Sequence, residues 1–228
     1  MLKLARRTIR ALPEWARTVK PDSPQVYDRT GSPLEPLSVD GKFFARGPQR
    51  SRLFGVTYGP FRPVTADEPF PPIAVVRDDF EKILALGANA IRTYHVPPEW
   101  LLELASERIG LLVDVPWSKH LCFLDSATHR KEAREAVARA ARRGSRFDSI
   151  LAYSIGNEIP PDVVRWHGAG RVERFLAELM DVSKQLDPTA LVTYANYPPT
   201  EYLDLSFLDF VTFNVYLHDR QVFGPYLL

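Results

Sequence analysis

Chemically useful side chains stand at the end of one apolar run of the sequence. Residues 150–156 are mostly apolar, and Asn157 and Glu158 follow them directly, ahead of two prolines that end the run. A glutamate is rarely buried without a partner, because removing its charge from water costs free energy. A carboxyl group held at the mouth of a strand can serve as a general acid or base. An Asn–Glu pair alone is also explained by a solvated loop or a helix cap, so the rest of the chain has to decide.

Similar polar or aromatic residues close the other apolar runs. Carboxyl, amide and flat aromatic groups together suit the hydroxyls and faces of a sugar ring. Each residue also has a structural explanation: an arginine can pair with a structural aspartate, and tryptophans such as Trp117 and Trp166 more often pack than stack. The candidates are Arg92, His95, Trp117, Asn157, Glu158, Asn214 and Tyr216.

Apolar runs and amphipathic segments alternate from Arg52 onward. Nearly continuous apolar strands alternating with helices indicate a parallel sheet that helices cover. We expect strands at 52–59, 88–95, 111–117, 149–158, 190–196 and 208–216, and helices at 73–87, 98–110, 129–144 and 170–188.

Two α/β folds fit this alternation, an eight-stranded (β/α)8 barrel and an open doubly wound sheet. An open sheet tends to bind ligands in one crevice, often beside a glycine-rich first turn. Candidate residues at the carboxyl ends of many strands are instead typical of a TIM barrel. The sequence therefore predicts a TIM-barrel type fold that is incomplete, with about six of its eight strands present.

Composition excludes several classes of function. The chain has 228 residues, a net charge of +1 and one cysteine. A near-neutral charge argues against a nucleic-acid surface, and a single cysteine excludes an internal disulfide and a multi-cysteine zinc site. The sequence contains neither a metal-binding motif nor a glycine-rich phosphate loop, so we expect no metal and no cofactor.

The start of the chain differs from the remainder. Residues 1–36 form a basic, proline-containing lead-in, and an Asp-Gly turn in the segment 37–47 predicts a small hairpin. We expect residues 37–228 to form the partial barrel. Neither a secretory signal nor a run long enough to span a membrane is evident, which favours a cytoplasmic location.

On these motifs the sequence resembles the catalytic barrel of glycoside hydrolase family 2, in the clan of retaining glycosidases. The stretches that carry the resemblance are "FGVTYGPF", "GANAIRTYHVPPEW" and "SIGNEIP", within about residues 38–220. The detail "GNEIPPDVVRWHG" is similar to a subgroup found with glycosyltransferase modules in bacterial polysaccharide-synthesis proteins. The resemblance implies an oligo- or polysaccharide substrate and a glycosyltransferase module as a partner.

The resemblance also implies a role for each residue. Glu158 would be the acid/base, and Asn157 would bind the 2-hydroxyl of the sugar. Arg92 and Tyr216 would orient the nucleophile carboxylate, and His95 would line the sugar subsite. The nucleophile of the family is a glutamate that ends strand seven, and the sequence matches the family only as far as strand six. Glu201 and Asp219 are the only acids expected near the same face.

Three hypotheses remain at this stage. The first is a C-terminally truncated retaining glycosidase barrel that acts on a β-linked glycan, itself inactive without its nucleophile. The second is a non-catalytic carbohydrate-binding module that guides a polymer for an attached synthase. The third is an unrelated barrel enzyme, which no metal-ligand cluster or phosphate loop favours.

Overall fold

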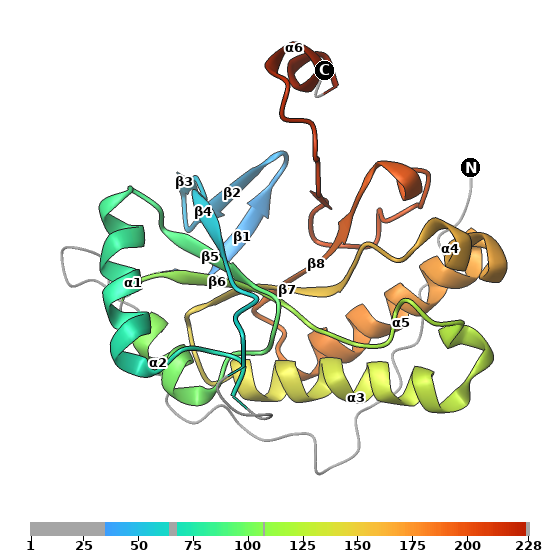
Figure 1. Ribbon diagram of the computed structural model, residues 1–228, viewed down its shortest axis with the longest axis horizontal. Coiled ribbons are helices and arrows are strands. Elements are labelled where there is room, and N and C mark those ends of the chain that lie inside the picture. The colour runs from blue at the N-terminus through green and yellow to red at the C-terminus, as the bar shows by residue number, and fades with distance from the viewer. Residues whose placement is uncertain (1–34, 64–67, 107, 227–228) are drawn as a thin grey trace.

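The computed structural model describes residues 35–63, 68–106 and 108–226, arranged as two sheets with helices (Figure 1). The expected lead-in, residues 1–36, therefore lies almost wholly outside the described residues. One sheet has three strands in the order β1-β2-β3, and the other has six in the order β4-β5-β6-β7-β8-β9. In the part of the chain that the structure describes, no helix is both long and apolar enough to cross a bilayer.

The elements follow one another with the expected alternation from β4 onward. The strands are β1 (Leu37–Asp40), β2 (Phe43–Arg46), β3 (Gln49–Ser51), β4 (Gly55–Tyr58), β5 (Ala90–Thr93), β6 (Gly110–Asp114), β7 (Ile150–Asn157), β8 (Leu191–Asn196) and β9 (Thr212–Phe213). The helices are α1 (Ile73–Ala85), α2 (Glu99–Ser106), α3 (Ala127–Gly144), α4 (Pro161–His167), α5 (Ala169–Leu186) and α6 (Arg220–Tyr226), with short 3-10 turns η2 (Phe123–Asp125) and η3 (Pro198–Thr200).

The predicted hairpin is present and is larger than expected. Strands β1 and β2 are antiparallel, and Asp40 pairs with Phe43 across a two-residue turn. Gly41 has a φ of +61°, a conformation that glycine adopts at little cost. Strand β3, which was not predicted, adds to β2. This small sheet lies on the face of the large sheet opposite α3 and α5 (Figure 1).

All neighbouring strands of the large sheet are parallel, as the sequence predicts. Successive side chains of a strand point to opposite faces, and the two faces have different neighbours. On β5, Ile91 belongs to the main core with the helices, whereas Ala90 belongs to a smaller core with Leu37 of β1. Arg92 lies two residues after Ala90 and so shares the inner face, away from the helices.

Helix α6 was not predicted, and β9 and α4 also differ from the sequence expectation. Strand β9 covers only Thr212–Phe213, whereas the sequence predicts a strand over residues 208–216. Helix α4 was not predicted, since the prolines after Glu158 suggested an irregular loop. Pro161 is in fact its first residue, a position where the missing N–H group is harmless because no helical carbonyl could accept it.

Candidate active site

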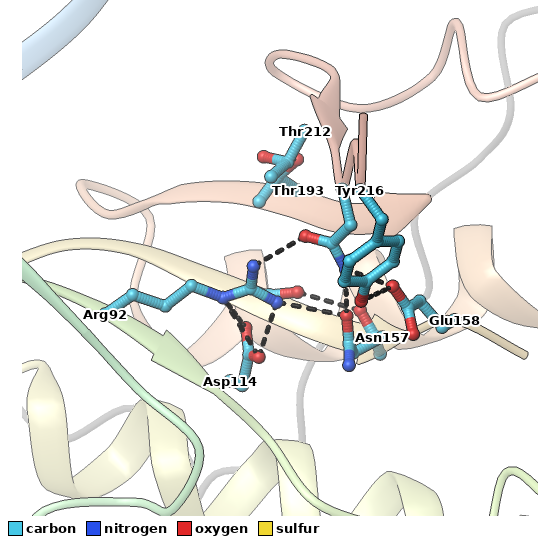
Figure 2. Close-up of polar contacts among 10 residues, drawn as sticks. Arg92, Asp114, Asn157, Glu158, Thr193, Thr212 and Tyr216 are labelled. Carbon is cyan, nitrogen blue, oxygen red and sulfur yellow. Dashed lines mark hydrogen bonds and ion pairs between the residues drawn. The ribbon is translucent and has the colours of Figure 1, made fainter. Parts of the chain in front are cut away.

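Arg92 lies at the centre of a cluster of polar side chains on the inner face of the large sheet (Figure 2). Its Nε and Nη2 atoms donate to both oxygens of Asp114, with Nη2–Oδ2 at 2.7 Å. Nη1 donates to Oδ1 of Asn214 at 2.7 Å, and Nη2 donates to Oδ1 of Asn157 at 3.0 Å. Arg92 thus joins residues from four places along the chain.

The hydrogen bond between Arg92 and Asn214 decides between the two candidate folds. Arg92 is on β5 and Asn214 follows β9, so four strand spacings separate them in the sheet. In a flat sheet that separation would be about 19 Å, farther than the two side chains can span. The sheet must therefore curl toward closure, as in a barrel.

Glu158 follows β7 and is held by its backbone and by its side chain. Its N–H donates to the Ala195 carbonyl at 2.9 Å. Its φ is +49°, and among the described residues it is the one non-glycine residue with a positive φ. Such a conformation is uncommon for a residue with a Cβ and often marks a functional position.

The two carboxylate oxygens of Glu158 have different surroundings. Oε1 accepts a hydrogen bond from Asn214 Nδ2 at 2.8 Å and a short one from the Tyr216 hydroxyl. No described residue donates a hydrogen bond to Oε2. The same Asn214 amide donates to Asn157 Oδ1 at 2.7 Å, which fixes the two neighbouring residues relative to each other.

Electrostatics around the cluster follow from burial and charge. The hydrogen bond to Glu158, with burial and the charge of that carboxylate, raises the pKa of Tyr216 to about 12. Burial raises the pKa of Asp114, and the hydrogen bonds from Arg92 oppose this. Burial lowers the pKa of Lys119, although the negative charges of Glu158 and Asp114 attract its ammonium group.

Five of the seven candidate residues meet in this cluster: Arg92, Asn157, Glu158, Asn214 and Tyr216. His95 lies in the loop after β5, and within the described part of the chain no hydrogen bond joins it to the cluster. The Trp117 indole donates to the Ile155 carbonyl at 2.7 Å and packs edge-on against Phe123. These contacts account for Trp117 by packing, and its role against a sugar stays a prediction.

Sequence reasoning missed Asp114 and Lys119. Asp114 lies inside the run "LLVDVPW", for which the sequence predicts an apolar strand. The signal that could have found it is Arg92, whose buried charge needs a carboxylate partner. The two acids that were expected nearby are occupied elsewhere: Glu201 accepts from Tyr226 at 3.4 Å, and Asp219 accepts from the Gln221 N–H at 2.8 Å. The described residues contain no group of three or more potential metal ligands.

A family model matches most of the chain. Residues 72–221 match the model described as "Glycosyl hydrolases family 2, TIM barrel domain". The chain belongs to glycoside hydrolase family 2. This family 2 chain therefore carries an incomplete TIM barrel, with the cluster at the carboxyl ends of its strands, where barrel enzymes place their active sites.

Individual relatives support the same fold. A putative β-glucuronidase from Formosa agariphila is 29% identical over 125 residues, which is 53% of this chain and 15% of that protein. The structure of a Bacteroides uniformis β-glucuronidase superposes with a TM-score of 0.69 at 20% identity, over 86% of this chain and 25% of that one. A Parabacteroides merdae β-glucuronidase gives a TM-score of 0.70 at 19% identity, over 85% and 25% of the two chains. The family 2 chain thus spans between 15% and 25% of the length of these relatives.

Proposed function

We propose that this chain supplies the acid/base half of a retaining glycosidase site that acts on a β-linked glycan. The observation that carries the proposal is the asymmetry of Glu158. Both donors, Asn214 and Tyr216, bind Oε1, which leaves Oε2 without a described partner. A carboxyl group with one anchored and one open oxygen can hold a proton on the open oxygen and present it to a substrate.

The proposed chemistry has two steps. In the first, Glu158 gives its proton to the glycosidic oxygen while the bond from that oxygen to C1 breaks and a nucleophile carboxylate bonds to C1. In the second, the Glu158 carboxylate takes a proton from water as the water oxygen bonds to C1 and the nucleophile leaves. Asn157, held by Arg92 and Asn214, would donate its amide N–H to the 2-hydroxyl of the sugar.

The nucleophile is the part of the site that the described acids do not supply. A retaining mechanism needs two carboxyl groups about 5 Å apart. Asp114 is unsuited to the second role, because Arg92 binds both of its oxygens and its side chain is only 6% exposed. We propose that Arg92, Asn214 and Tyr216 face the position where a nucleophile glutamate from strand seven would lie, as the family resemblance implies.

A terminal β-glucuronide is the first substrate to test, because the named relatives are β-glucuronidases or are described as putative ones. The amide, hydroxyl and carboxylate groups of the cluster could also bind sugar hydroxyls without cleaving the glycan, so non-catalytic glycan binding is the second candidate function. None of the named relatives is a glycosyltransferase, so the partnership with such a module stays a prediction.

The test is performed on a protein that contains these residues together with a nucleophile. Glu158→Ala should lower turnover about 10²–10⁴-fold on a substrate with a poor leaving group, and much less on an activated aryl β-glycoside. Added azide should restore turnover of the aryl glycoside and yield a β-glycosyl azide, because azide attacks C1 without needing a base. Equal, small losses on both substrates would show that Glu158 is not the acid, and binding without hydrolysis would support the binding module.

A further inference from the structure

A charged groove lies between the beginnings of α3 and α5, apart from the cluster around Glu158. It has a volume of about 400 Å³. Four arginines line it together with one acid and two apolar residues: Arg130, Arg134, Arg171, Arg174, Glu178, Leu124 and Phe175. The pairing of these charges separates a binding groove from an ordinary solvated surface.

Two of the four guanidinium groups have carboxylate partners. Arg134 donates to both oxygens of Glu178, at 2.6 and 3.1 Å. Arg171 lies 3.9 Å from an oxygen of Asp125.

The other two guanidinium groups have no carboxylate partner among the described residues. Arg130 donates to the neutral carbonyl of Leu124. Arg174 forms no ion pair with any described acid. Arg130 and Arg174 therefore leave an uncompensated positive charge in a groove lined by guanidinium groups. A guanidinium group can bind a carboxylate or sulfate group with two hydrogen bonds at once.

An exposed aromatic ring lies beside this groove. Trp166 of α4 is 69% exposed. Its indole N–H donates to Asp125 Oδ2 at 2.7 Å, so the ring is held in place while its surface stays open. The other oxygen of Asp125 faces Arg171. The ring and the groove thus lie on either side of one carboxylate.

The ring and the groove are on the same rim of the barrel as Glu158. Helix α4 begins at Pro161, three residues after Glu158. The segment between β6 and α3 runs from the cluster, near Lys119, to Leu124 and Asp125 at the groove. A polysaccharide that extends outward from the carboxyl ends of the strands would reach Trp166 first and then the groove.

We infer that Trp166 and the arginine groove form a second glycan-binding surface, which takes a polysaccharide that carries carboxylate or sulfate groups. The indole stacks on a sugar ring, and Arg130 and Arg174 bind the acidic group of a nearby residue of the polymer. The choice of a glycan as the ligand rests on the proposed function, whereas the free charges and the open ring do not depend on it.

The test measures binding of the 228-residue chain, immobilised at low density, to polygalacturonate, dextran sulfate and neutral dextran. Inorganic sulfate is a fourth ligand. The variants are Arg130→Gln with Arg174→Gln, Arg174→Gln alone, and Trp166→Ala. The control, Arg108→Gln with Arg139→Gln, removes the same charge from exposed arginines that pair with Glu81 and Glu135. Circular dichroism checks that each variant is folded.

We expect both acidic polymers to bind and neutral dextran not to bind. The double groove variant should weaken binding by at least about tenfold, because a hydrogen bond between charged groups contributes that much. Arg174→Gln should weaken it in part, without disturbing the Leu124 contact. Trp166→Ala should weaken binding of the polymers but not of inorganic sulfate.

Three results would overturn the inference. Equal weakening in the control variant would mean that binding depends on net charge only. If inorganic sulfate bound as tightly as the polymers, and Trp166→Ala weakened the binding of neither, the groove would be a site for a free anion. No binding of any acidic polymer would refute the surface altogether. These measurements involve no hydrolysis, so failure of the proposed hydrolysis would be recognised separately.

Discussion

At the scale of single residues, the cluster depends on one ion pair that is largely shielded from water. The Arg92 and Asp114 side chains are 15% and 6% exposed. Pairing compensates the cost of removing two charges from water only while both partners are present. Because Arg92 also holds Asn157 and Asn214, the loss of Asp114 should disturb the position of Glu158 as well as stability.

We therefore expect Asp114→Asn to lower the free energy of unfolding by about 3–5 kcal/mol, since Arg92 would keep a buried charge without a counter-ion. Urea denaturation measures the change. The matched control is Glu135→Gln, whose exposed pairs with Lys131 and Arg139 should contribute less than about 1 kcal/mol. Equal losses in both variants would mean that the buried pair has no special role.

The contact between Tyr216 and Glu158 predicts a dependence on alkaline pH. The pKa of Tyr216 is raised to about 12 in the folded chain. An unfolded tyrosine has a pKa of about 10. The folded state therefore keeps its proton longer, and the stabilisation from this contact is complete below about pH 10 and lost as the pH rises toward about 12.

Absorbance of tyrosinate near 295 nm tests this. Subtracting the titration of Tyr216→Phe from that of the wild type should leave one step with a midpoint of about 12. Glu158→Gln should move that step to lower pH, because an amide oxygen is a weaker acceptor than a carboxylate. A step that is unmoved by Glu158→Gln would contradict the hydrogen bond.

At the scale of elements, close packing of α3 on the sheet depends on a glycine. A Cβ atom at Gly144, the last residue of α3, would lie 2.0 Å from the Tyr153 hydroxyl. That tyrosine is buried on β7 and donates to Asp187 at 2.9 Å, so it cannot move aside cheaply. A larger residue at this position would push the helix from the sheet.

Gly144→Ala should therefore destabilise the chain by about 1–3 kcal/mol, although alanine favours helices. Thermal unfolding gives the comparison with Gly170→Ala in α5. There the new Cβ would meet Arg174 at 3.5 Å and Glu173 at 3.9 Å, both ordinary contacts, so the change should be neutral or stabilising by up to about 1 kcal/mol. A stabilising Gly144→Ala would show that the Tyr153 contact is not tight.

At the scale of the whole molecule, the large sheet has two edges. Strands β4 and β9 each pair on one side only among the described residues. Exposed apolar residues flank both edges, with Phe54 60% and Val211 64% exposed. Unpaired strand edges with apolar neighbours invite pairing with another chain.

We expect the 228-residue chain to associate as its concentration rises, and Val211→Lys to reduce this, because a lysine at an edge opposes pairing. Static light scattering over a concentration series measures the apparent mass. Val75→Lys makes the same change on the exposed face of α1 and should have little effect. A chain that stays monomeric throughout would show that the edges are protected.

The strand order, the hairpin and the face that carries the site could be predicted from sequence, because burial imposes a readable pattern on each strand. Helix α4 could not, since two adjacent prolines after a strand are compatible both with an irregular loop and with the first turn of a helix. Asp114 could not be assigned to the site from sequence, because the ion pair between Asp114 and Arg92 joins two strands and is visible only in the folded structure. The curl of the sheet depends on contacts such as that of Arg92 with Asn214, between residues far apart in the chain.

The positive φ of Glu158 is unfavourable for a residue with a Cβ atom, yet this is the residue to which we assign the acid/base role. Glycine or asparagine would adopt this backbone more readily, and Glu158→Gly should relieve about 1 kcal/mol of strain. A library randomised at position 158 and selected only for thermal resistance should thus drift to glycine or asparagine. The same library, carried in a protein that also contains the nucleophile and selected for growth on a glycoside, should keep glutamate. The divergence of the two populations would measure how far this residue is retained for its reactivity at the expense of the fold.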